Sequence, residues 1–184
     1  MSWNEDRKSR TRQRILESAA VLFTRQGFEG TSIDTVMEHA GLTRGAFYAH
    51  FESKSDLYAE ALQCAGLEHH ARLKDACPRE RVFAYLSDAH RKAETFNCPL
   101  ACLISDVAQQ DARVRDTYTR LFAGFVSHCQ GTDSEPDERK HALQQAVALI
   151  GGIAIARNLT DESLAQELLD ACRSLALDLV PAQS

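Results

Sequence analysis

Apolar residues recur at helical spacing through nearly the whole chain. No segment alternates apolar and polar residues as a half-buried strand would. Between residues 15 and 23 the spacing of the apolar residues places them on one face of an α-helix. These residues are Ile15, Leu16, Ala19, Ala20, Leu22 and Phe23. The pattern therefore predicts an all-α protein with about nine helices.

Residues typical of helix ends mark the limits of the first helices. Gly27 follows the first apolar face, at the position where glycine commonly ends a helix. Thr31 and Asp34 have the spacing of a capping box for a second, short helix. Gly41 ends that helix, and Thr43 is a candidate N-cap for a third short helix that runs to about residue 50.

Later helix signals divide the rest of the chain. A Ser53-x-x-Asp56 pattern opens a fourth helix, and Pro78 and Pro99 stand where a first helical residue belongs. The residues from 131 to 136 have the composition of a loop. The further helices are expected over residues 79–92, 99–109, 112–128, 137–158 and 164–179.

The segment from residue 31 to residue 54 has the organisation of a helix-turn-helix. Two short helices flank the tight turn Ala40-Gly41-Leu42. Ala40 is small enough for the helices to approach, and Gly41 can adopt a positive φ without a Cβ clash. The third helix can then project outward into a major groove.

Side chains on that third helix suit DNA. Thr43 combines a hydroxyl with helix N-terminal amides that can bind a phosphate. Arg44 can donate two hydrogen bonds to guanine or to phosphate. Tyr48 offers a hydroxyl to a phosphate, and the small Gly45 and Ala46 permit close approach.

The same segment resembles the DNA-binding domain of the TetR family of transcriptional repressors. That family combines an apolar first helix, a Thr-Ser or Thr-Thr opening, an Ala-Gly-apolar turn and a Gly-x-x-Tyr-x-His-Phe-x-x-Lys run. The chain supplies Thr31-Ser32, Ala40-Gly41-Leu42 and Gly45-Ala46-Phe47-Tyr48-Ala49-His50-Phe51-Glu52-Ser53-Lys54. The resemblance covers roughly residues 10–60, and it departs at Val36-Met37, where the family often has Ile-Ala.

The resemblance implies a homodimer that binds double-stranded DNA at a pseudo-palindromic operator and leaves it when a small-molecule effector binds. It implies a DNA-binding domain over residues 1–52 and an effector-sensing and dimerisation domain over residues 53–184. The expected DNA-binding residues are Thr31, Ser32, Thr43, Arg44, Gly45, Ala46, Tyr48, His50 and Lys54.

The last two expected helices carry apolar seams suited to dimerisation. Paired with their symmetry mates they would form a four-helix bundle, although the same seams could instead complete the core of one subunit. The first seam consists of Val147, Ile150, Gly151, Ala154 and Ile155, and the second of Leu164, Leu168, Cys172, Leu175 and Leu179.

The middle helices could enclose an effector pocket. Most candidate lining residues could equally be ordinary core, and His90 and Tyr118 are the candidate polar groups. The full set is Phe83, Leu86, His90, Phe96, Leu103, Val107, Tyr118, Phe122 and Phe125.

Two cysteines suggest an alternative means of regulation. Cys98 precedes Pro99, so the dipole of the next helix could lower the pKa of its thiol. Cys102 follows one turn later, and a sulfenic acid at Cys98 could condense with a second thiol. Oxidant or electrophile sensing is therefore a hypothesis, and two small core residues are the alternative.

Composition and charge narrow the remaining choices. The net charge is −5, but residues 1–54 hold 8 Lys and Arg against 7 Asp and Glu, and five of these cations lie within residues 7–14. A basic arm on an acidic body is compatible with local phosphate contact, or with a solvated helix start. The composition excludes low-complexity and collagen-like chains.

Other functional classes find little support. The chain contains no nucleophile elbow, Walker loop or His-Glu-x-x-His sequence, and no compact spacing of metal ligands. We therefore expect no enzyme activity, no cofactor and no metal. A helical ligand carrier would leave residues 31–54 unexplained. With no apolar signal segment and no bilayer-length apolar run, we expect a cytoplasmic protein without a membrane partner.

Overall fold

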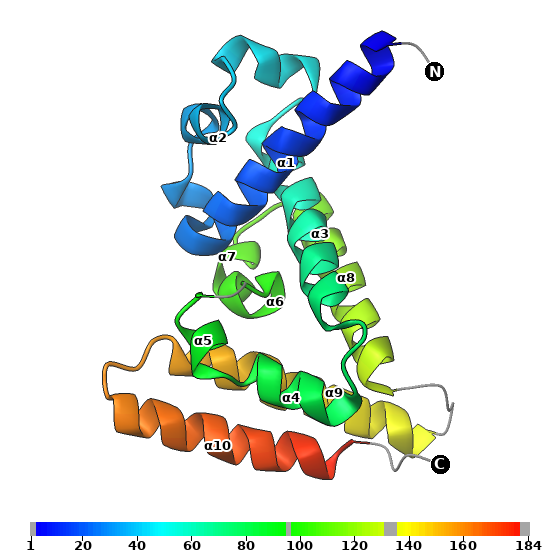
Figure 1. Ribbon diagram of the computed structural model, residues 1–184, viewed down its shortest axis with the longest axis vertical. Helices are drawn as coiled ribbons and strands as arrows, with labels where there is room; N and C mark the ends of the chain where they lie inside the picture. Colours follow the sequence, from blue (N-terminus) through cyan, green and yellow to red (C-terminus); the bar gives the residue numbers. More distant parts are fainter. Residues whose placement is uncertain (1–2, 95–96, 131–135, 181–184) are drawn as a thin grey trace.

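The computed structural model describes residues 3–94, 97–130 and 136–180, and these residues form helices and no strands. Figure 1 shows a small N-terminal head at one end and a pair of long antiparallel helices at the other. Two helices, α3 and α8, run side by side between these two ends (Figure 1). The expected all-α architecture is confirmed.

The head consists of three helices and the start of a fourth. Gly27, expected to end the first helix, instead lies within α1 as a kink, with φ 72° and ψ 179°. Phe23, Phe47 and Tyr58 are among the large side chains buried in the head core. The helices are α1 (Trp3–Gly30), α2 (Ile33–His39), the 3-10 helix η1 (Arg44–Ala49) and α3 (Lys54–Leu73).

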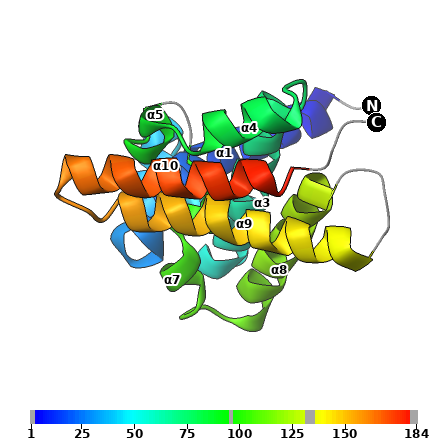
Figure 2. The same cartoon turned by 90° about the horizontal axis from the view of Figure 1, so that it is seen from below.

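The body is built around two long helices that lie side by side in Figure 2. These are α9 (Pro136–Ala156) and α10 (Glu162–Asp178), and α4 crosses the surface beside them. The remaining helices of the body are α4 (Pro78–Tyr85), α5 (Asp88–Arg91), α6 (Pro99–Cys102), α7 (Ile104–Val107) and α8 (Ala112–Gln130).

Two sequence-based expectations for these elements were wrong. The helix expected over residues 79–92 is divided, because Leu86 leaves helical geometry and the Ser87 hydroxyl caps α5 by accepting from His90 N–H at 3.1 Å. The helix expected over residues 99–109 is divided at Leu103, where φ is −116°. The described part of the chain therefore has eleven helices, and the third of them is a 3-10 helix.

Asp106 on α7 connects the body to the head. Its Oδ2 accepts hydrogen bonds from Phe28 N–H at 2.9 Å and from the Tyr58 hydroxyl at 2.5 Å. Nearby, Asp111 accepts from the Ser55 hydroxyl, and Arg113 pairs with Asp56. The junction between α1, α3 and the α7–α8 segment is therefore formed by hydrogen bonds and an ion pair. Asp106 lies beside the kink at Gly27.

The head core does not end at residue 52. Leu57, Leu62 and Val114 belong to the same buried cluster as Phe23. The expected boundary between a DNA-binding domain ending at residue 52 and a second domain starting at residue 53 stays a prediction, because the buried core extends across it. Among the described residues, no helix combines the length and the apolar character needed to cross a membrane.

Candidate DNA-binding surface and ligand cavity

The turn between α2 and η1 has the geometry expected of a helix-turn-helix. Gly41 has φ 65°, a conformation that L side chains rarely adopt, and Leu42 N–H donates to the Met37 carbonyl at 2.9 Å. Val36 and Met37 are buried in the head core. These buried side chains hold α2 against the head core, and the turn at Gly41 places the polar face of η1 at the surface.

The residue that caps α2 is Ser32 rather than Thr31. The Ser32 hydroxyl accepts from Thr35 N–H at 3.0 Å, so the capping box expected at Thr31 and Asp34 was wrong. Thr31 itself is 0% exposed. A DNA contact through the Thr31 side chain does not fit this burial.

The exposed face of η1 carries the other main candidates. Tyr48 is 62% exposed, and its ring is anchored edge-on against the buried Phe47 at 5.2 Å. Arg44 pairs with Asp34 at 2.6 Å, but both side chains are about 60% exposed, so this ion pair is weak and can be exchanged for a phosphate or a base. Thr43 is exposed and makes no side-chain cap hydrogen bond.

The small residues of η1 leave room for a close partner. A Cβ built on Gly45 would meet nothing within 4 Å, so the fold itself does not require a glycine there. Ala46 is half-buried and packs against the head core. A close approach to a nucleic-acid backbone is one use for the open space at Gly45.

Two candidates at the margin of this surface have internal contacts. His50 is half-buried, and burial, followed by the charges of Lys8 and Arg12, lowers its pKa. The Lys54 ammonium lies 4.1 Å from the centre of the Phe28 ring. A phosphate contact by Lys54 would compete with that cation–π contact.

Part of the basic arm supports the fold. Arg12 pairs with Glu60 at 2.5 Å, and its guanidinium lies 4.7 Å from the Phe51 ring. Arg14 donates to the Ala40 carbonyl at 2.6 Å, beside the turn. These two arginines position the helix-turn-helix, a role that sequence reasoning missed because both partners are distant in the chain.

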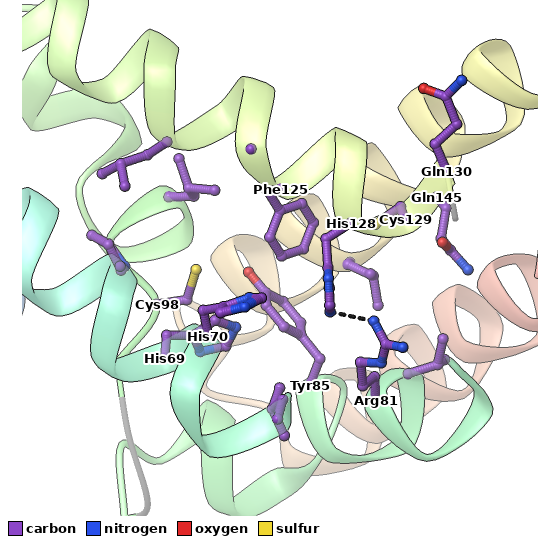
Figure 3. Close-up of a pocket in the computed structure, with 18 of the residues that line it drawn as sticks. His69, His70, Arg81, Tyr85, Cys98, Phe125, His128, Cys129, Gln130 and Gln145 are labelled. Atoms are coloured by element: carbon purple, nitrogen blue, oxygen red, sulfur yellow. Dashed lines mark hydrogen bonds between the residues drawn. The ribbon is translucent and has the colours of Figure 1, made fainter. Parts of the chain in front are cut away.

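A cavity of about 720 Å³ lies between α3, α4, α8 and α9, with the start of α6 in its wall (Figure 3). This size is typical of small-molecule sites. Its lining mixes aliphatic, aromatic and polar side chains. The lining residues are Gly66, Leu67, His69, His70, Leu73, Pro78, Arg81, Val82, Tyr85, Cys98, Pro99, Leu100, Arg120, Leu121, Gly124, Phe125, His128, Cys129, Gln130, Glu138, Gln145 and Leu149.

Most residues expected to line a pocket lie elsewhere. Phe125 does line the cavity. Leu86 and His90 are buried in the body and Leu103 and Val107 in the head core, and none of the four lines the cavity; the His90 ring packs behind its wall, against Tyr85 and His69. These assignments were wrong because helical periodicity identifies inward-facing positions without distinguishing a packed core from a cavity wall.

The other expected pocket residues have different surroundings. Phe83 is 49% exposed, beside the Arg173 guanidinium. The Tyr118 hydroxyl donates to the Leu100 carbonyl at 2.8 Å, and Phe122 packs against the body core. Phe96 lies outside the described residues.

Neither of the two candidate redox cysteines has the lowered pKa of an activated thiol. Cys98 is the N-cap of α6, as expected, but burial raises its pKa to about 11 despite hydrogen bonds that act in the opposite direction. Burial also raises the pKa of Cys102, although the Arg157 guanidinium contacts its sulfur. Desolvation therefore outweighs the helix dipole, and the expected activation of Cys98 is not seen.

The outer faces of α9 and α10 expose a band of apolar side chains. Val147 and Ile155 on α9 and Leu164 and Leu175 on α10 are between 48% and 66% exposed. Ile150, expected in the dimer seam, is 5% exposed and belongs to the body core.

The remaining members of the two seams lie between these extremes. They are half-buried, so each seam contains some residues that pack into the core of the subunit and others that are exposed at its surface. They are Gly151, Ala154, Leu168, Cys172 and Leu179.

Comparison with known proteins matches this geometry. Residues 15–61 match the family model described as bacterial regulatory proteins, tetR family. The HTH-type transcriptional regulator AcrR of Shigella flexneri is 52% identical over 50 residues, which cover 27% of this chain and 23% of AcrR. An uncharacterised HTH-type transcriptional regulator of Mycobacterium tuberculosis is 28% identical over 189 residues, covering 94% of this chain and 97% of that protein.

Solved structures share the whole fold. The reduced form of NemR from E. coli has a TM-score of 0.74 at 19% identity, covering 94% of this chain and 99% of NemR. A TetR-family regulator from Cytophaga hutchinsonii has a TM-score of 0.76 at 20% identity, covering 100% of this chain and 99% of that one.

A surface-exposed helix-turn-helix on an all-helical body defines the class of helix-turn-helix transcriptional regulators. Within that class, residues 15–61 match the TetR family, and the fold of the whole chain is that of the TetR-family structure from Cytophaga hutchinsonii.

Proposed function

We propose that this protein is a homodimeric transcriptional repressor that binds a pseudo-palindromic operator and is released from it by a small-molecule effector. The observation that carries the proposal is the outward face of η1, where Thr43, Arg44 and Tyr48 are exposed on a rigid, buried base. Hydroxyl, guanidinium and phenol groups on one projecting helix suit phosphate and base-edge contacts.

The apolar band on α9 and α10 supports the homodimer. Val147, Ile155, Leu164 and Leu175 expose large aliphatic side chains on two helices that pack side by side, and exposed apolar patches commonly mark an interface. Two-fold pairing of these helices gives a four-helix bundle. The two η1 elements then have to lie about 34–36 Å apart to enter successive major grooves.

The cavity and the polar junction support effector control. The cavity is lined by α3 and α8, and the same two helices are joined beside the head by the Ser55–Asp111 hydrogen bond and the Arg113–Asp56 ion pair. A ligand that binds more tightly to one relative position of α3 and α8 shifts the population towards that position. The spacing of the two heads, and with it DNA affinity, then changes.

DNA binding is tested with a duplex from the region upstream of the gene, or with one selected from random sequence. We expect Tyr48→Ala to weaken binding about tenfold or more, with a thermal midpoint within about 2 °C of wild type. Arg44→Ala weakens all sequences alike if the guanidinium binds phosphate, and relaxes preference at one base pair if it reads guanine. Arg115→Ala, which removes an exposed cation from α8, is the matched control.

Three results would contradict this proposal. Unchanged DNA affinity in Tyr48→Ala removes the contact, and loss of the fold shows that Tyr48 is structural. For the dimer, Val147→Glu and Leu175→Glu place charges in the proposed interface, so sedimentation should show monomers. A wild-type protein that sediments as a monomer at micromolar concentration contradicts the homodimer.

A further inference from the structure

The cavity wall contains an arginine, Arg81, that has no anionic partner among the described residues. Arg81 on α4 donates from Nε to the Ala76 carbonyl at 2.9 Å, and its Nη1 lies against Nε2 of His128 on α8 (Figure 3). Within the described part of the chain it forms no ion pair with a carboxylate. Because a guanidinium does not lose its proton in proteins, this wall of the cavity keeps a full positive charge.

The histidine beside Arg81 does not add to or cancel that charge. Burial, followed by the charges of Arg81 and His70, lowers the pKa of His128 to about 4. The His128 ring packs edge-on against the His70 ring, with 4.8 Å between their centres. At neutral pH, His128 is therefore a neutral acceptor, which an incoming anion can replace at the guanidinium.

The other charged residues of the lining are compensated or exposed. Arg120 is exposed, and its guanidinium donates to the Thr117 hydroxyl at 2.9 Å. Glu138 lies in the first turn of α9, where the helix dipole offsets part of the charge of a carboxylate, although its Oε2 is buried without a hydrogen-bond partner among the described residues. Arg81 is therefore the lining group that gains most from a ligand of opposite charge.

The rest of the cavity suits an apolar body. Tyr85 and Phe125 meet edge to face, with 5.6 Å between ring centres, and Val82, Leu100 and Leu149 complete this wall. The Tyr85 hydroxyl is directed at Cys98 (Figure 3). An aromatic or compact aliphatic group placed here gains both burial and ring contacts.

We propose that the cavity binds an organic carboxylate with an aromatic or compact aliphatic body, whose carboxylate accepts hydrogen bonds from the fork of Arg81. The chemical class of the ligand follows from the charge of Arg81 and from the apolar wall around Tyr85. Its action as the effector rests on the proposed function, but its binding to the cavity does not.

The proposal is tested by calorimetry on the full chain with two ligands of matched shape, naphthalene-2-carboxylate and naphthalene-2-carboxamide. We expect the carboxylate to bind about tenfold or more tightly than the amide, because an arginine–carboxylate pair is charge-assisted and often two-point. A naphthyl quaternary ammonium serves as the opposite-charge probe and is expected to bind more weakly than the carboxylate.

Three variants assign the effect to one guanidinium. Arg81→Gln should remove the preference for carboxylate over amide, and Arg81→Lys should retain part of it because the charge remains. Arg120→Gln, the matched loss of the second cavity arginine, should leave the preference unchanged. Two controls distinguish loss of the anion contact from loss of the fold. Each unliganded variant should keep its thermal midpoint, and each should still bind the neutral amide.

Each contrary outcome overturns the proposal. Equal binding of carboxylate and amide, an unchanged preference in a folded Arg81→Gln, tighter binding of the ammonium probe, or no binding of any probe at millimolar concentration would do so. Release of a bound operator duplex is measured separately. Carboxylate binding without DNA release leaves the ligand class standing and contradicts effector control through this cavity.

Discussion

The hydrogen bond from Tyr58 to Asp106 links the head to the body, and its removal tests whether that link is charge-assisted. Tyr58 is 0% exposed, and its hydroxyl donates to Asp106 Oδ2 at 2.5 Å. Tyr58→Phe keeps the ring contacts with Phe23 and Phe28, whose ring centres lie 4.7 and 5.1 Å away. The substitution therefore removes the donor and little else.

The expected cost follows from the charge of the acceptor. A hydrogen bond to a charged group contributes about 1.5–3 kcal/mol, against about 1 kcal/mol for a bond between neutral groups. Asp106 keeps its second donor, Phe28 N–H, at 2.9 Å. We therefore expect Tyr58→Phe to lower the free energy of unfolding by about 2 kcal/mol, which lowers the thermal midpoint by about 4–8 °C.

Urea unfolding of wild type, Tyr58→Phe, Asp106→Ala and the double variant measures the coupling between the two residues. Tyr118→Phe is the matched control, because its hydroxyl donates to a neutral carbonyl, that of Leu100, at 2.8 Å. We expect a loss for Tyr58→Phe that is about twice the loss for Tyr118→Phe. The coupling energy between Tyr58 and Asp106 should be about 1–2 kcal/mol.

Two results would refute this reasoning. A loss in Tyr58→Phe no larger than in Tyr118→Phe shows that the carboxylate adds nothing to the bond. Additive losses in the double variant show that Tyr58 and Asp106 act independently. In either case Asp106 could not be regarded as the residue that ties the body to the head.

Three further predictions concern packing, thiols and pH. A Cβ on Gly152 would lie 3.0 Å from Leu86 Cδ2 and 3.1 Å from Cys172, whereas one on Gly151 meets nothing within 4 Å. Gly152→Ala should therefore lower the free energy of unfolding in urea by about 1 kcal/mol, and Gly151→Ala should not lower it. The reverse order would contradict this packing. Because burial raises the pKa of Cys98 to about 11, mild peroxide should affect DNA binding alike in wild type and Cys98→Ser, and release that is lost in Cys98→Ser would restore the thiol-sensing hypothesis. Burial lowers the pKa of His69 to about 4 and of His90 to about 3, so the unfolded chain binds more protons below the ordinary histidine pKa of about 6.5. The stabilising contribution of the two neutral histidines should thus be fully present above that pH. The free energy of unfolding should fall as the pH drops from about 6.5 towards 4, by up to about 2 kcal/mol per histidine between pH 7 and 5. A thermal midpoint that stays constant over this range would contradict neutral, buried histidines.

The cavity marks the limit of what periodicity predicts. Leu86 and His90 have the spacing of inward-facing residues, and both are buried, yet neither lines the cavity. Arg81 and His128, which carry the polar chemistry of the cavity, are 47 residues apart in sequence and meet only because the fold brings α4 and α8 to the same cavity. No local pattern signals such a pair.

Local geometry was more predictable than electrostatics. The position of Cys98 at the N-cap of α6 was confirmed, but the direction of its pKa shift was opposite to that expected. The helix dipole is a local property, readable from Pro99. Desolvation depends on how many neighbours from distant helices cover the sulfur, and here it is the larger effect.

The sequence by itself determined the all-helical fold and most of its long helices, the left-handed turn at Gly41, the break at Gly27 and the exposed chemistry of η1, because these depend on contacts within a few residues. Only the tertiary structure decided which inward-facing positions became core, cavity wall or exposed band. It also assigned Arg12 and Arg14 to the fold, and Asp106 to the junction between head and body. The physical reason is that burial and charge pairing are set by the crossing of helices far apart in the chain, whereas turns and caps are set by the residues on either side.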